Sequence, residues 1–136
     1  MVWIKAFIAG FVATLLFHQS VIGLFWLADM IPSAPWNLSP VSPLGIPSVI
    51  SLSFWGGLWG VPVWWLIRRW QGVAHWLGAA LVGAVGPTAV AMLVVFPLKG
   101  LDVDGARIVG GLIVNGAWGV GVACSMRLMR QGVAGR

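Results

Sequence analysis

The sequence lacks the charged residues that keep most proteins soluble in water. Only 8% of its 136 residues are charged, whereas a soluble domain carries about a quarter. Glutamate is absent altogether, because the three acidic residues are Asp29, Asp102 and Asp104. Water is therefore not the main solvent of this chain.

Cysteine and the usual catalytic motifs are scarce as well. The one cysteine, Cys124, excludes an internal disulfide and a Cys-x-x-Cys site within a single chain. His18 and Asp29 lie about 16 Å apart along a helix, so we expect no trio of metal ligands to converge. The motifs of serine hydrolases, zinc proteases and phosphate-binding loops are also missing. The sequence therefore predicts neither a metal site nor an enzyme.

Positive charge is present but sparse. Eight Lys and Arg residues give a formal net charge of +5, and they are too few and too scattered to neutralise a track of phosphates. We therefore expect no nucleic acid partner and look to the lipid bilayer for the meaning of these charges.

Apolar residues make up 60% of the chain. A transmembrane helix needs about 20 of them in succession, and four stretches qualify, at approximately 3–30, 46–67, 74–97 and 108–129. The linker between the first two contains four prolines, which lack the amide donor that a helix requires. The sequence therefore predicts an all-α membrane protein, a single domain over residues 1–136 that forms a compact bundle of four transmembrane helices.

The distribution of Lys and Arg predicts the orientation, because short loops rich in these residues stay in the cytoplasm. Six of the eight basic residues fall on one side of the four spans, and none of the three acidic residues does. We expect both termini in the cytoplasm of a bacterial cell, a multi-pass location in its inner membrane, and the proline-rich linker in the periplasm. The basic residues on the cytoplasmic side are Lys5, Arg136 and four expected membrane-surface anchors, Arg68, Arg69, Arg127 and Arg130.

Small residues recur at fourfold spacing in every span, which is typical of close contact between membrane helices. The glycines that we expect to pack helices together are Gly10, Gly56, Gly60, Gly83, Gly111 and Gly119. We also expect Gly56, Gly60 and Gly119 to leave grooves that the chain's own helices do not fill, so that the protein assembles with a partner or with itself.

Polar side chains from all four spans share one depth in the outer half of the bilayer. Counted at about 1.5 Å per residue, this band consists of His18, Gln19, Ser53, Thr88 and Asn115. We place His18 on the face that carries Gly10 and Thr14, pointing into the bundle toward Asn115 or Thr88. Such a band either joins the helices through hydrogen bonds or lines a site open to the periplasm.

Three tryptophans lie deep in the predicted bilayer: Trp55, Trp59 and Trp118. They either fill the space beside small residues or flank a flat ligand. In the second case a haem or chlorin takes His18 as its axial ligand, or a quinone binds between the rings. The sequence does not identify a cofactor.

The size resembles that of small multidrug transporters and fluoride channels, which are also four-helix chains. The membrane-embedded glutamate of the former is missing here, and the strong charge bias disfavours the antiparallel dimers of these groups. The sequence favours a non-catalytic auxiliary subunit that packs against a membrane complex or against itself. The first alternative is a small transporter or channel that uses the polar band. The second alternative is a subunit that binds a haem, chlorin or quinone through His18.

Overall fold

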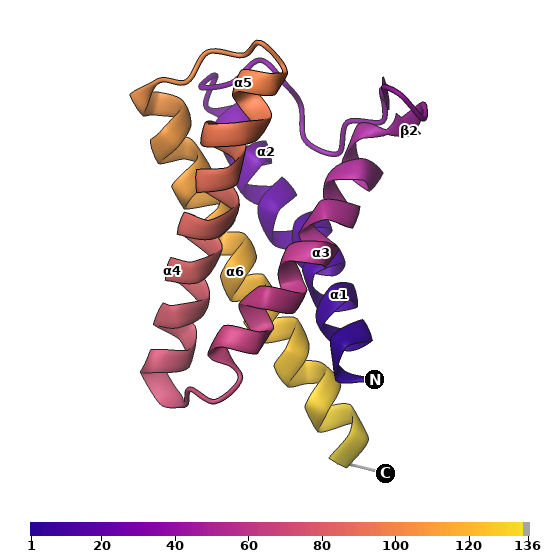
Figure 1. Ribbon diagram of the computed structural model, residues 1–136, viewed down its shortest axis with the longest axis vertical. Coiled ribbons are helices and arrows are strands. Elements are labelled where there is room, and N and C mark those ends of the chain that lie inside the picture. The colour runs from indigo at the N-terminus through magenta and orange to yellow at the C-terminus, as the bar shows by residue number, and fades with distance from the viewer. Residues whose placement is uncertain (135–136) are drawn as a thin grey trace.

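The computed structural model describes residues 1–134, most of them in helices (Figure 1). The elements, in chain order, are α1 (Val2–Ala13), η1 (Thr14–His18), α2 (Gln19–Leu27), β1 (Pro40–Val41), β2 (Ile46–Pro47), α3 (Ser48–Ile67), α4 (Gly72–Val90), η2 (Ala91–Val95), α5 (Phe96–Leu98) and α6 (Gly105–Ala134). Here η1 and η2 are turns of π-helix, in which the hydrogen bonds span five residues instead of four.

Four helices are long and apolar enough to cross a membrane, as predicted. Two are continuous through a π-helical turn, so that α1, η1 and α2 form one helix and α4, η2 and α5 another. Between 22% and 33% of the most apolar window in each helix is buried within the chain. Most of every helix surface is therefore left to face lipid or another protein.

The first helix ends three residues before the predicted boundary of its span. Asp29 has a left-handed backbone (φ 56°), while the N–H of Met30 donates to the Phe25 carbonyl oxygen at 2.9 Å and that of Asp29 to Trp26 at 3.1 Å. These two bonds form a Schellman motif, which closes a helix by using its last free carbonyls. Gly100 (φ 66°) ends α5 in the same way.

The linker from residue 28 to residue 47 contains five prolines and a short antiparallel ladder. In that ladder Pro40 pairs with Pro47 and Val41 with Ile46. The linker also packs on the first helix, where a Cβ atom added to Gly23 would lie 3.4 Å from the Pro35 ring. It therefore ties the end of α2 to the start of α3.

Glycines bring the helices together in two close pairs. Between α1 and α3, a Cβ added to Gly10 would overlap the Gly56 carbonyl oxygen and lie 3.0 Å from the Cα of Gly60. Between α4 and α6, a Cβ added to Gly83 would lie 2.6 Å from the Cα of Gly119. At these crossings the backbones themselves are in contact, which only glycine allows.

These contacts correct one expectation from the sequence. Gly56, Gly60 and Gly119 leave no grooves at these crossings, because the backbones of Gly10, Ala6 and Ala79 fill the space beside them. Gly111 also faces a neighbour inside the chain, the Thr88 side chain. Spacing alone identified the contact residues but not the helix that each of them contacts.

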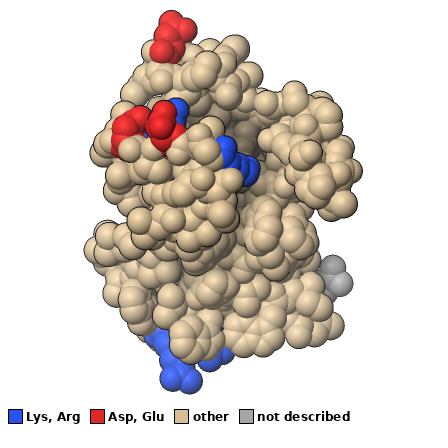
Figure 2. Space-filling model, turned by 45° about the horizontal axis from the view of Figure 1, so that its top comes forward, with Lys and Arg blue, Asp and Glu red and all other residues tan. Residues whose placement is uncertain are grey.

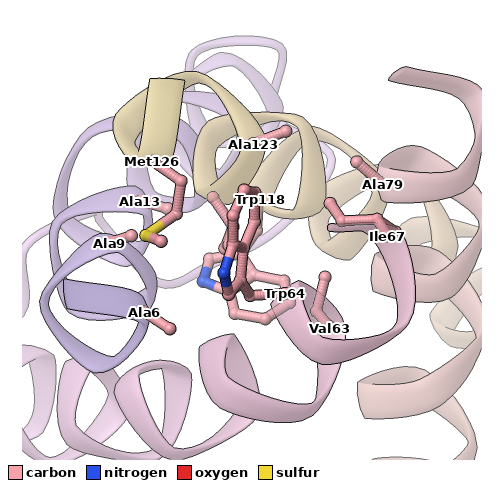
Figure 3. Close-up of a cluster of buried hydrophobic side chains, with 11 residues drawn as sticks. Ala6, Ala9, Ala13, Val63, Trp64, Ile67, Ala79, Trp118, Ala123 and Met126 are labelled. Atoms are coloured by element: carbon pink, nitrogen blue, oxygen red, sulfur yellow. The ribbon is translucent and has the colours of Figure 1, made fainter. Parts of the chain in front are cut away.

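The two pairs meet along α1 and α6, around a buried cluster of aromatic and small side chains (Figure 3). Trp64 of α3 and Trp118 of α6 lie in the middle, with alanines of α1 on one side and Ile67 and Ala79 on the other. Small residues on α1 leave room for these two indoles at the centre of the bundle.

Candidate functional site

The structure divides the predicted polar band into separate local contacts. Asn115 of α6 donates from its amide nitrogen to the Thr88 hydroxyl of α4 at 2.9 Å. Ser53, which is fully buried, donates to the Val49 carbonyl of its own helix at 2.7 Å. The first contact joins the paired helices α4 and α6, and the second lies within α3. These three side chains therefore already have partners inside the chain.

His18 does not follow Gly10 and Thr14 on the buried face as expected. The turn η1 adds one residue to that stretch of helix, and the N–H of Gln19 donates to the Thr14 carbonyl, five residues back. The extra residue rotates the helix, so that Gln19 (5% exposed) takes the buried position while His18 is half-buried. Wide turns of this kind recur at functional sites, but the sequence pattern does not reveal one.

Gln19 and the linker residue Trp36 form a small polar site over η1. The Trp36 backbone N–H donates to Gln19 Oε1 at 2.7 Å, and the Trp36 indole N–H donates to the Leu15 carbonyl at 2.9 Å. His18 Nδ1 lies 3.4 Å from Gln19 Nε2, so His18 faces Gln19 instead of Asn115 or Thr88. Trp36 was not among the predicted site residues, because nothing in its sequence neighbourhood indicates that the linker folds back onto the first helix.

A second polar contact lies at the centre of the bundle. The Gly10 carbonyl oxygen accepts hydrogen bonds from Thr14 Oγ1 and from Trp118 Nε1, both at 3.0 Å. Trp118 is 2% exposed and reaches this carbonyl from α6. Its indole therefore fastens α6 to α1.

The three deep tryptophans do not form one aromatic pocket. Trp55 and Trp59 line a shallow pocket of about 200 Å³ on the outside of α3, together with Leu58 and Pro62. Trp118 is buried in the core and does not line it. Trp55 faces outward and is 59% exposed, whereas Trp59, one turn further along α3, packs against the buried cluster and lies close to Gly86 of α4.

The predicted surface anchors gather at one end of the molecule. Arg68 lies over the Trp3 ring at 5.4 Å, and Arg127 lies over the Trp76 ring at 4.8 Å. Arg69 and Arg130 are exposed at the same end. Arg136 lies outside the described residues. Stacking on tryptophan places each of the two stacked guanidinium groups beside a ring that prefers the headgroup level of a bilayer.

His75 is a buried residue that was not among the predicted site residues. It is 3% exposed and its ring lies edge-on between Trp64 and Trp76. Its Nδ1 is 3.2 Å from the Ile67 carbonyl. The sequence does indicate that His75 is buried, because Gly78 and Ala79 follow it by three and four residues and so share its face of the helix.

Within residues 1–134, no group of three or more His, Cys, Asp or Glu side chains comes close enough to hold a metal ion. No family model matches the chain, and comparison with curated proteins and with solved structures found no similar protein.

Proposed function

We propose that this chain is a non-catalytic auxiliary subunit that packs against a partner protein in the membrane. The observation that carries the proposal is the pairing of its polar band. Asn115, Thr88 and Ser53 bond inside the chain, as expected of side chains that hold helices together. Side chains that line a path for a solute instead leave donors and acceptors free for it.

The outer surface of α3 supports the same proposal. Phe54, Trp55 and Trp65 are 49%, 59% and 55% exposed. Large aromatic side chains are enriched where proteins contact one another, because they bury much apolar area at low cost in side-chain entropy. We place the partner membrane protein on this face of α3.

The location we propose is the bacterial inner membrane, with both termini in the cytoplasm and the proline-rich linker in the periplasm. Figure 2 shows the acidic side chains toward one end of the molecule, with some basic side chains near them, and further basic side chains at the opposite end. At the acidic end Arg107 is paired with Asp104, at 3.7 Å between Nε and Oδ2, whereas Arg68 and Arg127 at the basic end stack on tryptophan. Short loops rich in Lys and Arg stay in the cytoplasm, and acidic residues have little influence, so we place the end with more basic residues there.

Photo-crosslinking in native membranes tests the subunit proposal. A photoreactive phenylalanine analogue at position 55 should give one discrete heavier adduct. The same analogue at position 93 on η2 is the matched control, since Leu93 is also exposed (76%), and it should give none. An adduct of twice the chain's own mass would identify a second copy of this chain as the occupant. Equal diffuse labelling at both positions would contradict the proposal.

The two π-helical turns favour a second candidate, a small transporter or channel. They interrupt the first and third membrane helices, and η1 contains His18. A π-helical turn leaves backbone groups off their usual partners, which is why such turns recur where proteins bind or move ligands. Solute or ion flux through liposomes that contain the purified chain alone would support this candidate over the subunit.

A further inference from the structure

A pocket at the basic end of the bundle has the composition of an anion site. It encloses about 470 Å³ between α1, the end of α3 and α6, which is within the size range of ligand pockets. Four basic side chains line it: Lys5, Arg68, Arg69 and Arg130. All three acidic residues of the chain are absent from its lining.

One residue that lines this pocket contains a buried donor without an acceptor. Trp64 lines the pocket and is 3% exposed, and its indole N–H has no hydrogen-bond partner among the described residues. Leaving such a donor buried and unpaired costs about 1–3 kcal/mol. The indole of Trp118, by contrast, donates to Gly10. Among the described residues, His75 Nε2 is also buried without a partner, but His75 does not line this pocket.

The surroundings of the pocket indicate where the anion comes from. Val2, Trp64 and Met126 add apolar surface to the same pocket, which a small inorganic anion would not use. Arg68, one of the lining cations, lies over Trp3, and such rings mark the headgroup level of a bilayer. The pocket thus offers cations and a donor for a phosphate and apolar side chains for the glycerol and first acyl carbons beside it.

We propose that this pocket binds the phosphate headgroup of an anionic phospholipid from the cytoplasmic leaflet, held by Lys5, Arg68, Arg69 and Arg130 with the Trp64 indole N–H as a further donor. Basic pockets between membrane helices on the cytoplasmic side are the places where such headgroups bind. The pocket needs no protein partner, but its assignment to the cytoplasmic leaflet rests on the orientation proposed above.

Native mass spectrometry of the detergent-purified chain tests the site, with phosphatidylglycerol, phosphatidylcholine or inorganic phosphate added. Phosphatidylglycerol should remain bound, and the other two should not. Lys5→Gln or Arg69→Gln should each weaken its binding about fivefold, the factor for one cation near an anionic headgroup. Arg127→Gln is the matched control, because it removes a charge from the same end without lining the pocket, and it should change binding by less than about twofold.

Several outcomes would overturn the proposal. An equal loss of lipid in Arg69→Gln and Arg127→Gln would mean diffuse attraction to a basic surface and no pocket. Retention of inorganic phosphate without a preference for phosphatidylglycerol would assign the pocket to a soluble anion. The indole ¹⁵N–H resonance of Trp64, identified by its loss in Trp64→Phe, should shift on adding phosphatidylglycerol. If it stays fixed while lipid binds, the headgroup lies elsewhere.

Discussion

At the residue scale, one position decides which polar side chain the bundle buries. The sequence pattern selects His18, four residues after Thr14, but η1 makes the step five residues long and Gln19 takes the place. Apolar and small residues surround this stretch on every side, so the sequence contains no periodic signal that distinguishes a step of four from a step of five. The contact of Asn115 with Thr88 could be predicted from the sequence. In a straight helix, the position of a residue determines both its depth in the membrane and the face on which it lies.

Substitutions at these neighbours should therefore differ in effect. Gln19→Leu removes the acceptor of the Trp36 backbone N–H and should lower the free energy of unfolding by about 1–3 kcal/mol. His18→Gln keeps a donor and an acceptor toward Gln19 and should change stability by less than about 0.5 kcal/mol. Thermal unfolding in mild detergent measures both. A folded His18→Gln protein that had lost flux or a bound pigment would instead assign the imidazole to transport or to a cofactor.

At the scale of elements, the helices were predictable and their pairing was not. Four apolar runs of sufficient length fix the number of membrane-crossing helices, and small residues fix the faces that pack. Those faces look alike on all four helices, however, since each offers glycine or alanine at fourfold spacing. The choice of α3 for α1 and of α6 for α4 depends on shape: Gly10 meets the backbone of Gly56, and Gly83 that of Gly119.

Two glycines of α6 provide a test of this pairing. Gly119→Ala would push a methyl group into the Ala79 carbonyl of α4 and should destabilise the protein by about 1–3 kcal/mol through overpacking. Gly110→Ala is the matched control, since its nearest neighbour would be Phe25 at 3.9 Å, and it should be neutral or slightly stabilising. Both are compared by melting temperature in one detergent. Equal melting temperatures would mean that α4 and α6 do not cross at Gly119.

At the scale of the whole molecule, charge separates the two ends of the bundle. The positions of the charged residues were enough to predict this separation, because six of the eight basic residues lie on the side of the spans that has no acidic residue. Composition could not predict the pocket at the basic end. Lys5, Arg69 and Arg130 are far apart in the chain and meet only because α1, α3 and α6 converge there.

The proposed orientation predicts which loops are reached from outside the cell. In a Cys124→Ala background, Ser39→Cys and Asp102→Cys should react with a membrane-impermeant thiol reagent on intact cells. Gln71→Cys, between α3 and α4, should react only after the membrane is opened. All three native side chains are exposed, so a difference in labelling reports the side of the membrane and not burial. Labelling of position 71 on intact cells would reverse the orientation.

The contact between α1 and α6 also sets an order for assembly during synthesis. The contact between Gly10 of α1 and Gly60 of α3 can form as soon as both helices have left the ribosome. The alanine face of α1 must then wait in lipid, or against the insertion machinery, for α6, which begins 38 residues after the end of α3. When it arrives, the Trp118 indole bonds to the Gly10 carbonyl, and the earliest and latest helices of the bundle lock together. Trp118 therefore joins α6 to α1 only after the second helical hairpin, made of α4 and α6, has been synthesised.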